Sequence, residues 1–200
     1  MTGRRAGLAG VVLAGGASRR MGRDKATLTV AGLFDGRTLV EHLVSVVAQR
    51  CDPVYVVAAQ GQVLPDLPAQ VLRDEVPGLG PLPAVGLGLR TAACAGAERA
   101  FVCAVDMPFL TPELIDQLVN SARVRGPDSE ADIVLPSADR DHYLAAVYRT
   151  ALAETIDALV ATGERRVGAL VAMVGVQRIG PSDSAALANL NSPDDIRGLL

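Results

Sequence analysis

Residues 8–25 read LAGVVLAGGASRRMGRDK, and this stretch decides the fold. Its first part, residues 8–14, is an apolar run too short for a helix and is typical of a strand buried on both faces of a sheet. Glycines and cationic side chains follow at the carboxyl end of that strand, where ligands bind in open α/β sheets. The sequence therefore predicts a central strand that leads into a ligand-binding loop.

The loop has the composition of a phosphate-binding segment. Glycines without a Cβ let backbone N–H groups approach phosphate oxygens, and hydroxyl and cationic side chains add donors and positive charge. These side chains are Ser18, Arg19, Arg20, Arg23 and Lys25. A solvated, charged turn is the plain alternative, but the coincidence of glycines and cations at a strand end favours a triphosphate ligand.

Short apolar runs alternate with longer stretches of helical period along the rest of the chain, which indicates a three-layer α/β fold with a Rossmann-like, mostly parallel sheet. Further strands are expected at residues 54–58, 70–72, 101–105, 133–135 and 143–148. Helices are expected from a Thr38–Glu41 capping box to about Arg50, from a Gly/Pro-rich loop at 74–83 to about Ala95, from Thr111-Pro112, at 152–161, at 167–174 and from Ser192. The short turn between the last two strands predicts an antiparallel excursion.

Length and composition narrow the function. The 200 residues fit one domain, residues 1–200, with a sizeable core. The net charge of −3 disfavours a broad surface for nucleic acid or anionic membrane, and three Tyr, three Phe and no Trp leave little for base stacking. No stretch approaches the roughly 20 apolar residues of a membrane-spanning helix. We therefore expect no nucleic-acid and no membrane partner.

The cysteines and the N-terminus point to a reducing compartment. Cys51, Cys94 and Cys103 are odd in number and far apart, which favours buried, inert thiols over a disulfide framework or a zinc site. Arg4-Arg5 and the uncharged stretch after it resemble a twin-arginine export signal. That stretch is glycine-rich and runs into the charged loop, so a buried first strand explains it better. We expect a cytoplasmic protein.

The spacing of the loop excludes two common phosphate loops, because neither G-x-G-x-x-G nor G-x-x-x-x-G-K-[ST] fits it. The run resembles instead the signature L-A-G-G-x-S-x-R-M-G-x-D-K of the MobA-like nucleotidyltransferase family, and every fixed position is present. The resemblance spans the whole chain and implies a fold like that of the nucleotide-diphospho-sugar transferases. It implies that the Leu-Ala-Gly backbone reads the base and that the lysine contacts the phosphates. These roles fall on Leu13, Ala14, Gly15, the adjacent Gly16, and Lys25, with Arg20 as a helper.

Two acidic residues follow strands. Asp106 comes after the strand at 101–105, and a strand-end carboxylate is a hard oxygen ligand of the kind Mg²⁺ prefers. A turn or cap residue is the plain alternative, but the family's D-M-P segment matches here and implies the metal aspartate. Asp74 corresponds to a nucleotide-contacting aspartate and precedes G-L-G-P-L at 78–82. The family's guanylyltransferase branch continues G-P-L with A-G, where this chain has Pro83-Ala84.

Two asparagines near the C-terminus belong to a further segment that the family shares. Asn189 and Asn191 alternate, so on an extended strand they face the same side about 7 Å apart. The family's N-x-N-[ST]-P segment closes the cleft, which implies a role for Asn191, although strand exit and helix capping also explain Ser192-Pro193. The family often has an asparagine at the end of the second strand, whereas residues 56–60 here read VVAAQ. We assign no residue to that nucleotide contact.

The resemblance implies an activity. The terminal phosphate of molybdopterin attacks the α-phosphorus of GTP in line, which gives molybdopterin guanine dinucleotide and pyrophosphate. Lys25, Arg20 and Asp106 are the implied catalytic residues, and Mg²⁺ on Asp106 is the implied cofactor. The implied partners are GTP, molybdopterin with or without molybdenum, and molybdenum-insertion and molybdoenzyme maturation proteins.

Three alternatives stay open. The first is a cytidylyltransferase that acts on molybdopterin or another small phosphorylated acceptor; Gly80-Pro81-Leu82 favours guanylyl transfer instead. The second is a catalytically idle nucleotide-binding module, against which the retention of Lys25 and Asp106 argues, because a pure binder needs no metal at the α-phosphate. A nicotinamide oxidoreductase is the weakest, since its glycine fingerprint is missing.

Overall fold

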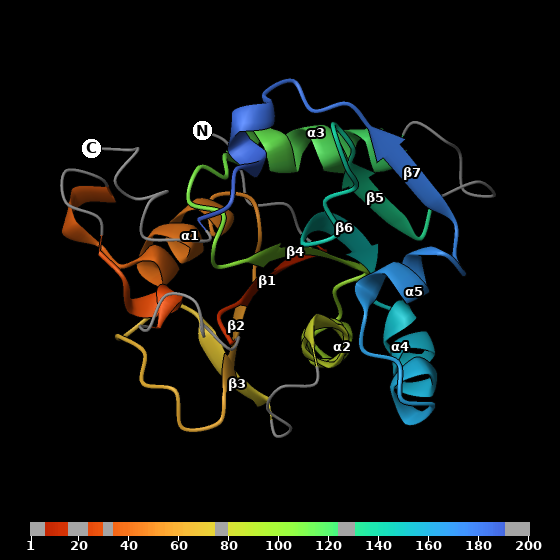
Figure 1. The fold of residues 1–200 in the computed structure, drawn as a ribbon, viewed down its shortest axis with the longest axis horizontal. Coiled ribbons are helices and arrows are strands. Elements are labelled where there is room, and N and C mark those ends of the chain that lie inside the picture. The colour runs from red at the N-terminus through yellow and green to blue at the C-terminus, as the bar shows by residue number, and fades with distance from the viewer. Residues whose placement is uncertain (1–6, 16–23, 30–33, 75–79, 124–130, 191–200) are drawn as a thin grey trace.

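The computed structural model of the chain describes residues 7–15, 24–29, 34–74, 80–123 and 131–190. Seven strands form one sheet in the order β3-β2-β1-β4-β6-β5-β7, with helices on both faces (Figure 1). The strands are β1 (Leu8–Leu13), β2 (Val54–Ala59), β3 (Gln70–Asp74), β4 (Arg99–Ala104), β5 (Ile133–Pro136), β6 (Ala145–Arg149) and β7 (Val176–Ile179). The helices are α1 (Leu39–Val47), α2 (Pro81–Cys94), α3 (Pro112–Arg123), α4 (Leu152–Ala161) and α5 (Val167–Val171). The expected three-layer α/β fold is confirmed.

β1 is the central strand, and both of its faces are buried. Leu8 and Val12 pack into the core shared with α1 and α3, whereas Val11 and Leu13 pack into the core shared with α2, α4 and α5. Glycines let a helix approach each face closely. A Cβ on Gly10 would lie 2.3 Å from a Val47 methyl carbon of α1. The continuous apolar run of β1 is therefore explained by burial on two sides.

A second close approach mirrors the first. A Cβ on Gly88 of α2 would lie 2.5 Å from a methyl carbon of Val11, on the opposite face of β1. The two glycines thus set the distance of both helix layers from the central strand.

One strand reverses direction. β6 runs antiparallel to β4 and to β5, while β1 is parallel to its neighbours β2 and β4, and β5 is parallel to β7. This confirms the antiparallel excursion expected from the short turn between β5 and β6. It also leaves the carboxyl ends of β1 to β4 together at one edge of the sheet.

α1 begins as the sequence predicts. The Thr38 hydroxyl accepts a hydrogen bond from the backbone N–H of Glu41, and the Glu41 carboxylate accepts one from the backbone N–H of Thr38 at 2.8 Å. The capping box is confirmed. The expected helix at residues 152–161 is confirmed as well.

Several expected boundaries were wrong. β7 was not predicted, because its four residues are half-exposed and become a strand through pairing with β5. β3 extends two residues past Leu72, to Asp74, and α5 ends at Val171. Cys94 is exposed rather than buried, whereas burial raises the pKa of the Cys51 thiol to about 12. The helix expected from Ser192 lies outside the described residues.

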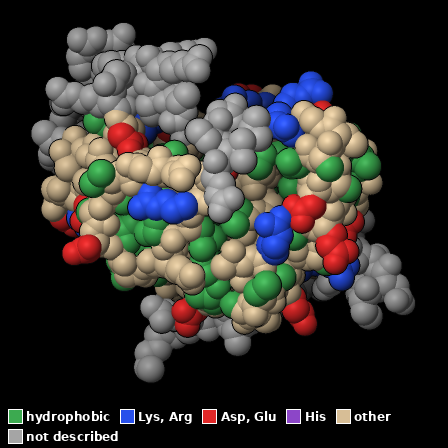
Figure 2. Space-filling model, turned by 90° about the horizontal axis from the view of Figure 1, so that it is seen from below, with side chains coloured by type: hydrophobic (Ala, Val, Ile, Leu, Met, Phe, Trp, Pro, Cys, Tyr) green, Lys and Arg blue, Asp and Glu red, His purple; other side chains and the backbone are tan. Residues whose placement is uncertain are grey.

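Charged side chains on the surface lie among neutral ones. On the face in Figure 2, Lys and Arg side chains are separate from one another and some adjoin acidic ones. Arg90 of α2 is paired with Asp157 of α4. Within the described ranges, none of the helices is long and apolar enough to cross a membrane.

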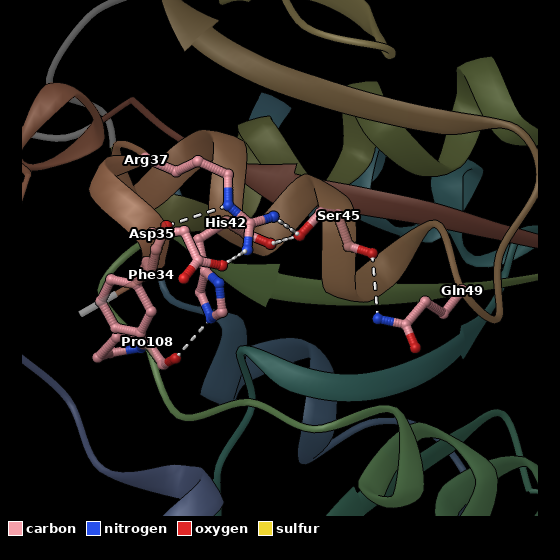
Figure 3. Close-up of polar contacts among 7 residues, drawn as sticks. All are labelled: Phe34, Asp35, Arg37, His42, Ser45, Gln49 and Pro108. Carbon is pink, nitrogen blue, oxygen red and sulfur yellow. Dashed lines mark hydrogen bonds and ion pairs between the residues drawn. The ribbon is translucent and has the colours of Figure 1, made fainter. Parts of the chain in front are cut away.

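His42 fastens α1 to the chain that follows β4 (Figure 3). Its Nε2 lies 3.0 Å from the Pro108 carbonyl oxygen, which can only accept, so Nε2 carries the proton. The Phe34 ring stacks on the imidazole with centroids 4.1 Å apart. Nδ1 is buried and has no hydrogen-bond partner within the described part of the chain. Burial and the Arg37 charge therefore lower the pKa of His42.

We expect this histidine to make stability depend on pH. Its pKa is lower in the folded state, so the unfolded chain binds more protons near the ordinary value of about 6.5. The stability from neutral His42 is fully present above that pH and falls as the pH drops through it. Lowering the pH from about 7.5 to 5.5 should reduce the Tm of the wild type more than that of His42→Gln.

Thermal unfolding at several pH values measures this difference. The pKa of His142 is also lowered, so some dependence will remain in both proteins. Parallel Tm curves for the two proteins would show that His42 does not contribute.

Candidate active site

The site lies at the edge where four parallel strands end. Leu13 closes β1 and is in register with Val57 of β2 and Ala104 of β4. The backbone N–H of Val105 donates to the Leu13 carbonyl at 3.0 Å. The segments that follow β1 and β4 therefore start side by side, which brings the glycine motif next to Asp106.

The Leu-Ala-Gly backbone is held by β2. The N–H groups of Ala14 and Gly15 both donate to the Val57 carbonyl, at 2.8 and 3.0 Å. A Cβ on Gly15 would lie 3.0 Å from the Ala59 nitrogen, so the close approach of β2 requires glycine here. These two N–H groups hold the start of the glycine motif against β2.

Gln62 secures the same turn and was missed by the sequence analysis. Its Oε1 accepts from the Ala59 N–H at 2.9 Å, and its Nε2 donates to the Ala14 carbonyl at 3.1 Å and to the Asp24 carboxylate at 2.7 Å. One amide thus joins the ends of β1 and β2 to the far end of the glycine motif. No residue was assigned to a nucleotide contact after the second strand, and nothing in the sequence pattern indicated the contacts of Gln62.

Asp24, which accepts the hydrogen bond from Gln62, also fixes the backbone at Lys25. Its other carboxylate oxygen accepts from the Ala26 N–H at 2.9 Å and caps a 3₁₀ turn, η1 (Lys25–Thr27). The capped turn fixes the backbone from which the Lys25 side chain extends.

Lys25 and Asp106, which follow the adjacent strands β1 and β4, form an ion pair. Lys25 Nζ lies 3.3 Å from Asp106 Oδ2, and the two side chains are 17% and 21% exposed. Residues 81 positions apart are therefore paired in a largely desolvated place. Such a pair places a cation next to a hard oxygen ligand at the end of the motif.

Asn189 completes the environment of Asp106. Its amide Nδ2 donates to Asp106 Oδ1 at 3.0 Å, and the backbone N–H of Leu190 donates to the Asp106 carbonyl at 2.8 Å. The residue expected to act in this segment was Asn191, which lies outside the described residues. Asn189 is the asparagine that the structure places on the aspartate.

Asp74 closes β3 and pairs in register with Ala59 of β2, which puts it at the same edge, two strands from β1. α2 begins at Pro81, inside the stretch that was expected to be a loop. Gly80 has a φ of 79°, and a Cβ on it would meet the Arg165 carbonyl at 2.8 Å, so glycine is required. Pro83 falls in the first turn, where backbone N–H groups have no partner within the helix, and so the departure from G-P-L-A-G is accommodated.

Other motif residues cannot be placed. Gly16, Ser18, Arg19, Arg20 and Arg23 lie outside the described residues, as does Asn191. Leu13, Ala14, Gly15, Lys25, Asp74 and Asp106 all lie at one edge of the sheet.

Asp106 is a single carboxylate that could bind Mg²⁺ only together with ligands from a substrate or water. Within the described ranges, no group of three or more His, Cys, Asp and Glu side chains is placed to hold a metal. Asp106 offers one carboxylate, and each of its oxygens accepts one hydrogen bond and has capacity for another partner. Mg²⁺ is often held by one or two carboxylates together with substrate phosphates and water. Asp106 therefore suits a metal that is bound jointly with a nucleotide.

Comparison with known sequences identifies the family. Residues 10–178 match the model of the MobA-like NTP transferase domain. A probable molybdenum cofactor guanylyltransferase of Mycobacterium marinum is 62% identical over 189 residues, which are 94% of this chain and 91% of that protein. One of the same description from Mycobacterium tuberculosis is 60% identical over 185 residues, 92% of this chain and 89% of that one.

Solved structures share the fold. Molybdopterin-guanine dinucleotide biosynthesis protein A from Archaeoglobus fulgidus has a TM-score of 0.73 at 21% identity, over 95% of each chain. The 2-C-methyl-D-erythritol 4-phosphate cytidylyltransferase from Thermus thermophilus has a TM-score of 0.68 at 21% identity, over 94% of this chain and 95% of that one. The family match, with the motif and the Lys25–Asp106 pair at one sheet edge, leads to one conclusion: the chain belongs to the MobA-like NTP transferase family and is a nucleotidyltransferase.

Proposed function

We propose that this protein transfers GMP from GTP to the terminal phosphate of molybdopterin. The observation that carries the proposal is the Lys25–Asp106 pair at the carboxyl edge of β1 and β4, in a chain 60–62% identical to proteins described as molybdenum cofactor guanylyltransferases. An oxygen of the molybdopterin phosphate attacks the α-phosphorus of GTP. The bond from that phosphorus to the β-phosphate oxygen breaks, and pyrophosphate leaves with the electron pair.

Positioning and charge neutralisation supply the catalysis, because phosphoryl-type transfers leave little covalent chemistry to the protein. The Leu13-Ala14-Gly15 backbone is the part of the site proposed to read the base. Lys25 stabilises the charge that develops on the departing pyrophosphate. Asp74 contacts the nucleotide from the end of β3, while Gly16, Arg20 and Asn191 have the roles implied by their motifs.

Asp106 is the proposed protein ligand of Mg²⁺. When bound, Mg²⁺ neutralises phosphate charge and polarises phosphorus. The Asp106 carboxylate holds Lys25 Nζ and the Asn189 amide at hydrogen-bond distance. These contacts orient the lysine, and a preoriented cation lowers the reorganisation needed for transfer.

Cytidylyl transfer is the alternative, since the shared fold also serves a cytidylyltransferase. Gly80-Pro81-Leu82 at the start of α2 favours guanylyl transfer. A cytoplasmic location and contacts with molybdenum-insertion and molybdoenzyme maturation proteins stay predictions.

Nucleotide selectivity is the direct test. With Mg²⁺, GTP at 100 times its Kd should stabilise the native state by about 2.7 kcal/mol and raise the Tm by about 5 to 10 °C, with a much smaller rise for CTP. The same preparations, given molybdopterin, should release pyrophosphate with GTP and form molybdopterin guanine dinucleotide. Stabilisation and product formation by CTP alone would establish the alternative, and no product with either nucleotide would refute the proposal.

Lys25→Ala should mainly lower kcat. Its charge is proposed to matter more as pyrophosphate charge develops than in the ground state, so kcat should fall by about 100-fold or more. The KM for GTP should change much less, because several other groups of the loop hold the phosphates. Steady-state kinetics on the purified variant measure both constants.

Asp106→Asn is the companion variant, since it keeps the shape of the side chain but removes the charge. It should lose nearly all activity even in saturating Mg²⁺. The protein should still fold, with a lower Tm, because Lys25 loses its ion-pair partner. A raised KM for GTP with an unchanged kcat in Lys25→Ala would make Lys25 a binding residue and would contradict its proposed role.

Gln62→Glu should weaken GTP binding. The change keeps Oε1 as the acceptor for the Ala59 N–H but replaces the donating amide with a carboxylate facing the Ala14 carbonyl and the Asp24 carboxylate. The lost hydrogen bond from Gln62 to the Asp24 carboxylate should displace the turn that holds Lys25 and the start of the glycine motif. The KM for GTP should therefore rise about tenfold or more at neutral pH.

Gln60→Glu is the matched control, because it makes the same change at an exposed position two residues away. Its KM for GTP should stay within about twofold of the wild type, as is usual for surface substitutions. Equal effects of the two substitutions would mean that added charge, and not the contacts of Gln62, is responsible.

A further inference from the structure

The segment after β4, which carries Asp106, is held by hydrogen bonds from three elements. The Val105 N–H donates to the last carbonyl of β1 at 3.0 Å, and the Asp106 carbonyl accepts from the Leu190 N–H at 2.8 Å. The Pro108 carbonyl accepts from His42 Nε2 of α1 at 3.0 Å. The first two bonds join backbone groups, so His42 makes the one bond of these three that depends on a side chain.

The same helix also holds the segment of Lys25. The Lys25 carbonyl accepts from the Leu28 N–H at 3.1 Å, and the Leu28 carbonyl accepts from the Leu39 N–H at 2.9 Å. Leu39 is the first residue of α1, and His42 follows it within one turn of the helix. One turn of α1 therefore contacts both segments whose side chains form the Lys25–Asp106 pair.

A rarely adopted backbone conformation holds the His42 ring in place (Figure 3). Phe34 and Asp35 have φ values of 57° and 53°, in the left-handed region that residues other than glycine seldom occupy. Arg37 secures this turn, because its Nε donates to the Phe34 carbonyl at 3.1 Å and a terminal nitrogen donates to the Asp35 carboxylate at 3.4 Å. The turn presents the Phe34 ring to the imidazole, with centroids 4.1 Å apart. Strained residues of this kind gather at functional sites.

Packing alone does not account for a histidine at this position. Nδ1 is buried without a hydrogen-bond partner among the described residues, so its desolvation opposes folding. Burial lowers the pKa of His42, and the neutral imidazole has one N–H, which Nε2 donates to Pro108. A polar ring with an unpaired buried nitrogen points to a role for the bond that its other nitrogen makes.

We propose that His42 is a positioning residue for the transfer reaction, whose bond to Pro108 sets the distance and orientation of the Lys25 cation relative to the Asp106 carboxylate. It acts through the backbone of the segment after β4 and is not itself a catalytic residue. The inference rests on the proposed function, in which that lysine and aspartate act on the phosphates. A displacement of about 1 Å can slow a reaction about 100-fold, so the loss of such a residue lowers kcat.

His42→Ala and His42→Gln test this role in kinetics at about pH 8, well above the ordinary histidine pKa of about 6.5. His42→Ala removes the donor, so kcat should fall about tenfold or more, with the KM for GTP within about threefold of the wild type. The glutamine amide nitrogen can occupy the place of Nε2, so His42→Gln should restore kcat to within about threefold. The assays are run well below the Tm of each variant, so that every protein is folded.

Thr150→Val is the matched control, because it removes another hydrogen bond from a buried side chain to a backbone carbonyl. Thr150 Oγ1 donates to the Ala97 carbonyl at 2.7 Å, at the opposite end of β4 from Asp106. This variant should lower the Tm and leave kcat within about twofold of the wild type. Equal falls in kcat in His42→Ala and Thr150→Val would mean that lost stability is responsible, and would overturn the proposal.

A double-mutant cycle in thermal unfolding tests the link without any substrate. Lys25→Ala breaks the ion pair and should lower the Tm of the wild type. If His42 positions the pair, the pair is already impaired in His42→Ala, and Lys25→Ala should then lower the Tm by about half as much or less. Equal lowering in the two backgrounds, or a wild-type kcat in His42→Ala, overturns the proposal. A coupled cycle in a protein that forms no product from GTP and molybdopterin defeats the proposed function instead, so the two failures are distinguishable.

Discussion

The packing of α1 and α2 against opposite faces of β1 is the constraint on which the rest of the structure depends. Gly10 and Gly88 allow contacts that a methyl group would block, with Val47 on one side and Val11 on the other. Close packing of this kind transmits small displacements, because interiors have few voids to absorb them. The helices on both faces therefore fix the position of the β1 carboxyl end and of the residues that follow it.

A buried ion pair lies at this edge of the sheet, where each charged side chain has a partner that offsets its desolvation. Lys25 and Asp106 are about four-fifths buried, and each lowers the cost of desolvating the other. The Asn189 amide satisfies the remaining oxygen without adding a charge. In the proposed mechanism, the phosphates of the nucleotide meet an organised cation and carboxylate rather than side chains that must first be ordered.

Neutral groups support the charged ones. The Gln62 amide joins Ala14, Ala59 and Asp24, and the His42 imidazole holds the Pro108 carbonyl two residues after Asp106. Gln62 both donates and accepts hydrogen bonds, and His42 donates one, while both side chains are uncharged, so neither adds a charge near the Lys25–Asp106 pair. The His42 pKa is lowered by burial, which keeps this support neutral at physiological pH.

Local patterns in the sequence determined much of this protein. The apolar run of β1, the Thr38–Glu41 capping box, the antiparallel β6 and the placement of Lys25 and Asp106 at one edge follow from hydrophobic periodicity, cap chemistry and the rule that parallel strands end together. The family match agrees with the motif from Leu13 to Lys25. β7, the first turn of α2, the Gln62 contacts and the choice of Asn189 were decided by tertiary structure alone. Each depends on a partner that is distant in the chain, namely β5, the Arg165 carbonyl, Asp24 and Asp106, and hydrogen bonds between distant residues leave no period or spacing in a sequence.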